Sequence, residues 1–135
     1  MKNIIFGVVI LLGFAIFAFS IYRKGKKTFA ITEVSVVQSV INVGIIPEDS
    51  IKYARFILRN IGAAKLKVLN IEPDCHCTMA EIDSSFVKDE NEIYIRAAFD
   101  NKITGTFQRT IKVFLNTNDS PKILTLRGRV LPSEK

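Results

Sequence analysis

The run Asp74-Cys75-His76-Cys77 brings thiols, an imidazole and a carboxylate together in the sequence. Thiolates bind soft ions such as Cu(I), and they also take part in redox exchange. In an extended backbone Cys75 and Cys77 would point to one face and His76 to the other, so the three side chains could not converge on one ion. The predicted soft-metal site therefore consists of Cys75 and Cys77, with His76 and Asp74 as accessory residues.

Two other interpretations of these cysteines stay open. They could act in thiol redox chemistry or oxidation sensing, or they could be small, partly buried residues at a strand end, with His76 facing solvent. A bridge across one residue would close a small, strained ring, so we expect no disulfide framework. A tetrahedral zinc site lacks ligands, because His76 is the only histidine.

Hydrolytic chemistry finds little support in the sequence. A Ser-His-Asp arrangement would have to combine His76 with Ser84 or Ser85, and neither serine lies in a nucleophile elbow. Glycine patterns typical of phosphate or dinucleotide binding are also missing from the sequence. We therefore expect a protein that is not an enzyme, with no catalytic residues, no cofactor other than the candidate metal, and no small-molecule substrate.

Short β-type runs separated by turn residues follow the first 27 residues. In residues 51–60, for example, Ala54, Phe56 and Leu58 alternate with polar or exposed positions. We predict strands over 37–44, 51–60, 65–71, 93–99, 107–117 and 123–130, a loop over 83–92, and a hairpin formed by the last two strands. This organisation is typical of an all-β, Ig-like antiparallel β-sandwich.

Residues 3–22 contain no charged side chain, and a helix of about 20 apolar residues matches the hydrocarbon core of a bilayer. We predict a single-pass transmembrane helix that contacts membrane lipid. A cleaved signal peptide, with Ala18-Phe19-Ser20 at its cleavage site, is the alternative. The expected organisation is an anchor with its basic flank (1–27), a connector or first strand (28–36), the sandwich (37–131) and a tail (132–135).

The formal net charge of +6 is concentrated at the ends of this helix. The cationic residues of the first 27 positions are Lys2, Arg23, Lys24, Lys26 and Lys27. The remainder of the chain is close to neutral, so a nucleic-acid partner is not expected. Under the positive-inside rule, the basic flank Arg23, Lys24, Lys26 and Lys27 favours a cytoplasmic location for the domain that follows.

Several motifs, in order, resemble the bacterial family of domain of unknown function 1573. They begin with Val43-Gly44-Ile45-Ile46 and continue with an F-x-L-x-N-x-G strand end and a C-x-C-T element. The strand end corresponds to Phe56, Leu58, Asn60 and Gly62, and the C-x-C-T element to Cys75-His76-Cys77-Thr78. The motifs that follow are Phe99-Asp100, Gly105 with Phe107, Thr117-Asn118-Asp119, and Leu126 with Gly128 and Val130. His76 stands where the family usually has glycine.

The resemblance implies an Ig-like domain held outside the cytoplasm at the bacterial cell envelope, opposite to the indication of the flanking charges. We follow the resemblance, because the positive-inside rule is a statistical bias. The expected function is structural or protein-interacting, with an unidentified protein partner. Exposed residues of one strand face, such as Tyr53, Arg55 and Arg59, could contribute to the partner surface.

Overall fold

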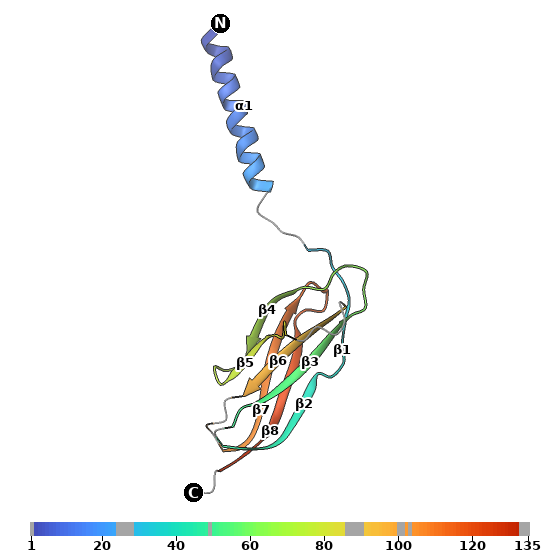
Figure 1. Cartoon of the computed structure of the whole chain (residues 1–135). Helices are drawn as coiled ribbons and strands as arrows, with labels where there is room; N and C mark the ends of the chain where they lie inside the picture. Colours follow the sequence, from blue (N-terminus) through green and yellow to red (C-terminus); the bar gives the residue numbers. More distant parts are fainter. Residues whose placement is uncertain are drawn as a thin grey trace.

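The computed structural model describes residues 2–23, 29–48, 50–85, 91–99, 102 and 104–132, and Figure 1 shows one helix and a two-layered β domain. Within the helix, side chains are described for residues 7–8 and 10–19. The elements are α1 (Lys2–Arg23), β1 (Val34–Val36), β2 (Val40–Pro47), β3 (Lys52–Asn60), β4 (Val68–Pro73), β5 (Thr78–Ile82), β6 (Glu92–Phe99), β7 (Gly105–Leu115) and β8 (Lys122–Leu131).

The β domain is a sandwich of two four-stranded sheets, as predicted. One sheet has the order β1-β3-β6-β5 and the other the order β2-β8-β7-β4. The predicted hairpin is confirmed, since β7 and β8 pair antiparallel from Gly105↔Val130 to Val113↔Lys122. The two sheets pack face to face and enclose one hydrophobic core.

Side-chain alternation places the core residues between the sheets. In β3 the side chains of Ala54, Phe56 and Leu58 are buried, whereas Tyr53 and Arg55 are exposed. The interior side chains with no more than 1% exposure are Phe56, Leu58, Ile95, Ala97, Ile111, Val113, Leu124, Leu126 and Val130. Because successive residues of a strand face opposite sides, these positions define the inner faces of both sheets.

The prediction of a purely antiparallel sandwich is wrong for one pair of strands. β2 runs parallel to β8, with Val40 opposite Thr125 and Pro47 opposite Leu131. The chain first adds β1 to the edge of one sheet and then crosses, at residues 37–39, to the edge of the other. A crossing between sheets allows parallel pairing, whereas a tight hairpin joins antiparallel strands.

Strand β5 was missing from the sequence prediction. It lies at the edge of its sheet and pairs with β6 from Thr78↔Phe99 to Ile82↔Ile95. Its inward position at Thr78 is polar and its outward positions include Met79, so the segment lacks regular apolar and polar alternation. Edge strands often carry polar residues of this kind, which discourage pairing with other chains.

The helix prediction is confirmed as to secondary structure, since α1 covers Lys2–Arg23. Within the residues that the structure describes, no helix is both long and apolar enough to cross a membrane. Of the predicted basic flank, Arg23 ends α1, while Lys24, Lys26 and Lys27 lie outside the described residues. Residues 100, 101 and 103, between β6 and β7, also lie outside the described residues.

The connector, residues 29–33, is bound to the sandwich where β3 and β7 end. Thr32 donates its hydroxyl proton to the side-chain oxygen of Asn60, at 2.8 Å, and bridges in parallel to Thr117. A Cβ on Gly62 would lie 2.5 Å from the main-chain nitrogen of Glu33, so glycine allows the connector to pass this closely. Two motif residues, Asn60 and Gly62, thus hold the point where the chain joins the domain.

Candidate functional site

Cys75 and Cys77 form a disulfide in the structure, with Cα atoms 5.3 Å apart. The expectation that they would stay unbridged is therefore wrong. It rested on the strain of a ring that spans one residue, but residues 74–77 turn between β4 and β5 and bring the two cysteines together. This Cα separation lies within the range of ordinary disulfides, which is about 4.4–6.8 Å.

Hydrogen bonds outside the disulfide already order this turn. The main-chain nitrogen of Thr78 donates to the carbonyl of Cys75 at 3.2 Å, which closes a four-residue turn. Asp74 donates its main-chain N–H to the carbonyl of Thr110, and its carboxylate accepts the N–H of Thr110, both at 2.9 Å. Asp74 therefore extends the pairing of β4 with β7, and its proposed accessory role at a metal is not needed to explain its position.

The two sulfurs have different surroundings. Cys77 packs against the hydrophobic core. Cys75 lines an open hollow of about 380 Å³, together with the exposed His76. The Sγ of Cys75 also lies 3.5 Å from the hydroxyl of Thr78, a residue that is only 3% exposed. In a disulfide the sulfur carries no proton, so the hydroxyl is the donor in this contact.

The disulfide changes what the predicted metal site can do. Bonded sulfurs are not thiolates, so Cys75 and Cys77 could serve as soft-metal ligands only after reduction. Within the part of the chain that the structure describes, three or more His, Cys, Asp or Glu side chains do not gather closely enough to hold an ion. Copper binding through the two cysteines stays a prediction.

The disulfide closes a loop of only three residues. A ring of this size restricts the unfolded chain weakly and stabilises a protein by about 1–2 kcal/mol in the loop-entropy model, compared with nearly 5 kcal/mol for a loop of about 100 residues. Because hydrogen bonds already hold the turn, the disulfide contributes little to the stability of the fold.

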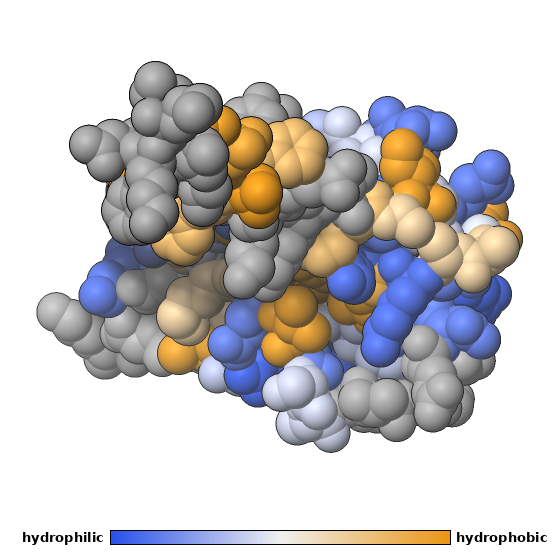
Figure 2. Space-filling model, turned by 90° about the horizontal axis from the view of Figure 1, so that it is seen from above, coloured by the Kyte–Doolittle hydropathy of each residue, from blue (hydrophilic) through white to orange (hydrophobic). Residues whose placement is uncertain are grey.

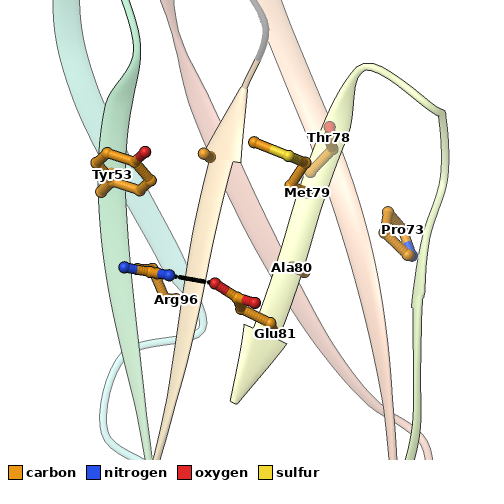
Figure 3. Close-up of a pocket in the computed structure, with 8 residues that line it drawn as sticks. Tyr53, Pro73, Thr78, Met79, Ala80, Glu81 and Arg96 are labelled. Atoms are coloured by element: carbon orange, nitrogen blue, oxygen red, sulfur yellow. Dashed lines mark hydrogen bonds and ion pairs between the residues drawn. The ribbon is translucent and has the colours of Figure 1, made fainter. Parts of the chain in front are cut away.

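A second hollow, of about 450 Å³, lies on the outer face of the β3-β6-β5 sheet (Figure 3). We call it the outer groove. Tyr53, Ala98 and Met79 occupy neighbouring positions on three adjacent strands and form its apolar part. Tyr53 is 59% exposed and Met79 57%, although neither side chain is strongly polar. Pro73 and Thr78 line both this groove and the hollow beside Cys75.

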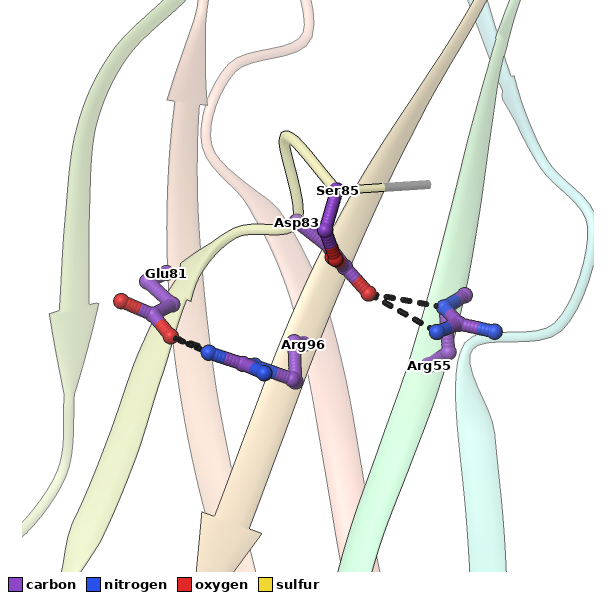
Figure 4. Close-up of polar contacts among 5 residues, drawn as sticks. All are labelled: Arg55, Glu81, Asp83, Ser85 and Arg96. Atoms are coloured by element: carbon purple, nitrogen blue, oxygen red, sulfur yellow. Dashed lines mark hydrogen bonds and ion pairs between the residues drawn. The ribbon is translucent and has the colours of Figure 1, made fainter. Parts of the chain in front are cut away.

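One charged pair lines the outer groove, and others lie elsewhere on the same sheet (Figure 4). Glu81 and Arg96 form an ion pair across β5 and β6, and the guanidinium of Arg96 lies 5.3 Å from the ring centroid of Tyr53. The hydrogen bond to Glu81 raises the pKa of Arg96. An ion pair and a cation–π contact thus fix the position of Arg96 at one end of the groove.

The next ion pair joins Arg55 of β3 to Asp83, which follows β5, at 2.9 Å. Ser85 donates a hydrogen bond of 2.6 Å to the other carboxylate oxygen. These contacts, with the hydrogen bond from Ser85 contributing most, hold the pKa of Asp83 below its usual range. A third pair, between Arg59 and Glu92 at 2.9 Å, continues this outer face toward the end that carries the connector.

The sequence identified part of this surface. Tyr53, Arg55 and Arg59 lie on the exposed face of β3, as predicted. Met79 and Ala98 were missed because β5 was not recognised, and because β6 carries buried residues on both faces. Figure 2 shows another view of the molecule, in which hydrophobic side chains lie among hydrophilic ones.

The comparison with families is decisive. The model of the family described as protein of unknown function (DUF1573) matches residues 34–130. The chain belongs to this family. The match runs from the first residue of β1 to the residue before the end of β8, so the resemblance seen in the ordered motifs is confirmed.

Solved structures share the fold of this DUF1573 domain at low sequence identity. A protein of unknown function from Porphyromonas gingivalis W83 superposes with a TM-score of 0.63 at 13% identity, over 78% of this chain and 50% of that one. The Vibrio cholerae VesB protease gives 0.54 at 16%, over 72% and 31%. The ASH/PapD-like domain 7 of human CEP192 gives 0.53 at 13%, over 81% and 91%.

These likenesses concern the fold alone. The DUF1573 chain spans half of the Porphyromonas protein and about a third of the Vibrio protease. A search of curated proteins returns no match.

Proposed function

We propose that this DUF1573 protein is a membrane-anchored, non-enzymatic interaction domain of the bacterial cell envelope, displayed outside the cytoplasm. The observation that carries the proposal is the outer groove beside the unpaired edge of β5. Within the described residues β5 pairs with β6 alone, so main-chain groups on its other side face outward. Such an edge accepts an additional strand.

The partner that fits this site is an extended segment of another envelope protein. Its backbone would pair with β5, and one of its apolar side chains would pack against Met79 at the near side of the groove. The ion pair of Glu81 and Arg96 would then lie at the rim of the contact, where charged groups contribute mainly to specificity.

Two observations support the location. Residues 3–22 carry no charged side chain, which is the composition that a membrane anchor requires. The disulfide between Cys75 and Cys77 supports an oxidising compartment, because disulfides are rare in the cytosol.

A second candidate function is thiol redox chemistry at Cys75 and Cys77, and the presence of the disulfide favours it. Copper binding is the weaker form of this alternative, because it would require prior reduction of the two sulfurs.

Site-specific photo-crosslinking tests the interaction function. A photoreactive residue at Met79 of the full-length chain, in native membranes, should give one reproducible crosslinked protein. The matched control is the same residue at Ile123, which is 46% exposed on the other sheet. Loss of the Met79 product on a charge reversal at Glu81 and Arg96 would locate the contact. Identical products from Met79 and Ile123, or none from either, would contradict it.

A topology experiment tests the location separately. A reporter that is active only outside the cytoplasm, fused after Lys135, should give a signal. Activity only from a cytoplasm-active reporter would reject the proposed side of the membrane without affecting the groove.

A further inference from the structure

We propose that the Cys75–Cys77 disulfide exchanges with a pair of thiols on another protein, and that Cys75 is the sulfur that forms the intermolecular bond. The inference rests on the second candidate function and adds the substrate class and the order of the two cysteines. It does not depend on the outer groove as a binding site or on the location of the domain.

Access distinguishes the two sulfurs. Cys75 lines the hollow of about 380 Å³ with Pro73, Asp74, His76 and Thr78, whereas Cys77 is packed against the core. A thiolate must reach the sulfur that it attacks, so an incoming cysteine meets Cys75 first. Cys77 is then the leaving sulfur.

The surroundings of Cys75 also favour its thiolate form once the disulfide is reduced. The hydroxyl of Thr78, within a residue that is 97% buried, lies 3.5 Å from Sγ and can donate a hydrogen bond to a thiolate. The open hollow and the hydroxyl of Thr78 assign nucleophilic behaviour to Cys75, and the packing of Cys77 against the core assigns resolving behaviour to Cys77.

The exchange balances without a further reagent. A thiolate of the partner bonds to Sγ of Cys75, the Cys75–Cys77 bond breaks, and Cys77 leaves as a thiolate that takes up a proton. The second thiolate of the partner then attacks the partner sulfur of the mixed disulfide, and Cys75 leaves as a thiolate. The partner dithiol has been oxidised to a disulfide and this protein reduced to a dithiol, by two electrons. The reverse sequence oxidises this protein at the expense of a partner disulfide.

A purely structural role explains the disulfide less well. The ring spans three residues, and the turn already has hydrogen bonds between Cys75 and Thr78 and between Asp74 and Thr110. A structural staple gains most when it closes a long loop. A bridge that adds little to folding but opens onto the surface fits exchange better.

The first experiment measures reduction of the full-length wild-type chain, in detergent, with dithiothreitol as the probe. Alkylation of the released thiols and mass spectrometry give the rate in native buffer and in denaturant. Direct exchange predicts native and denatured rates within about tenfold of each other. If reduction requires global unfolding, the native rate should be slower by roughly 10³-fold or more, and that result would overturn the proposal.

The second experiment tests the order of the two cysteines with oxidised glutathione as the probe. Cys77→Ser retains Cys75 and should form a mixed disulfide at least about ten times faster than Cys75→Ser, because its thiol is accessible and hydrogen bonded. Circular dichroism of both variants checks that they fold. Equal rates, or faster reaction of Cys75→Ser, would reject the assignment of Cys75 while leaving redox exchange itself supported by the first experiment.

Discussion

The side-chain amide of Asn116 donates a hydrogen bond of 2.7 Å to the main-chain carbonyl of Ala30, 86 positions earlier in the chain. The same amide donates to the carbonyl of Lys65 at 2.9 Å, and its oxygen accepts the main-chain N–H of Lys67 at 2.7 Å. Asn116 is 6% exposed, so its own side chain is largely shielded from water. One side chain thus joins the connector, the segment before β4 and the end of β7.

Asn116→Ala should lower the free energy of unfolding by about 3 kcal/mol, because it removes three hydrogen bonds that contribute about 1 kcal/mol each. Urea unfolding of the full-length chain, followed by circular dichroism, measures the change. Asn118→Ala, at an exposed position two residues on, is the control and should change stability by less than about 0.5 kcal/mol. Equal effects of the two substitutions would contradict the role of Asn116.

Gly62→Ala should destabilise the domain by about 2 kcal/mol, since overpacking forces neighbouring atoms to move. The added Cβ would lie 2.4 Å from the hydroxyl oxygen of Thr32 and 2.5 Å from the nitrogen of Glu33. The side chain of Thr32 could rotate away, but the backbone of Glu33 has to shift. Ala63→Ser, at an exposed neighbour, is the control, and comparison of the urea midpoints checks the prediction. Normal stability of Gly62→Ala would show that the connector is held less tightly.

Asp83→Asn should remove an acid-sensitive part of the stability. Because the pKa of Asp83 is lowered in the folded state, its contribution is complete above the unfolded pKa of about 3.9 and is lost as the pH falls through the folded pKa. The wild type should be more stable than Asp83→Asn near neutral pH, and the difference should disappear in strong acid. Urea unfolding over a series of pH values measures it.

The control for this experiment is Asp119→Asn. Lys122 also lowers the pKa of Asp119, but the side chain of Asp119 is 65% exposed. Solvent screens such a pair, so the pH-dependent difference should be smaller than at Asp83. If Asp83→Asn differs from the wild type by the same amount at every pH, the ion pair with Arg55 is not its source.

Thr78→Val, introduced into Cys77→Ser, should slow the reaction of Cys75 with oxidised glutathione by about tenfold near neutral pH. Valine preserves the shape of the side chain but cannot donate a hydrogen bond to the thiolate. The pH profile of alkylation should also move to higher pH, which a general loss of packing would not produce. The control Thr125→Val, at a partly buried position of β8, should leave the reaction rate and the pH profile of Cys75 unchanged. An unshifted profile for Thr78→Val would remove the hydroxyl from the mechanism.

Periodicity predicted the strands whose inner faces are apolar. Phe56, Leu58, Ile111 and Val113 recur at every second position, and their burial follows from that spacing. The edge strand β5 was missed because the inward residue of its first position is Thr78 and no regular apolar alternation marks it. Alternation of apolar and polar residues cannot detect an edge strand whose inward-facing residue is polar.

The sequence predicted which residues form the cysteine site but not that the two cysteines are bonded to each other. Cys75 and Cys77 were identified because of their residue types, whereas their bonding depends on a turn that spacing alone does not define. Pairing of β2 with β8 was likewise invisible, since Val40 and Thr125 lie far apart in the sequence. The contribution of Asn116 depends on three segments that meet only in the folded domain.

The parallel pairing of β2 with β8 has a mechanical consequence. β2 lies near the start of the domain and β8 ends it, and their ladder extends from Val40↔Thr125 to Pro47↔Leu131. A force that pulls the two ends of the chain apart would slide these strands past one another. Their hydrogen bonds would then share the load along the ladder, instead of opening one after another from an end. A domain in which this ladder bears the load resists stretching along its length.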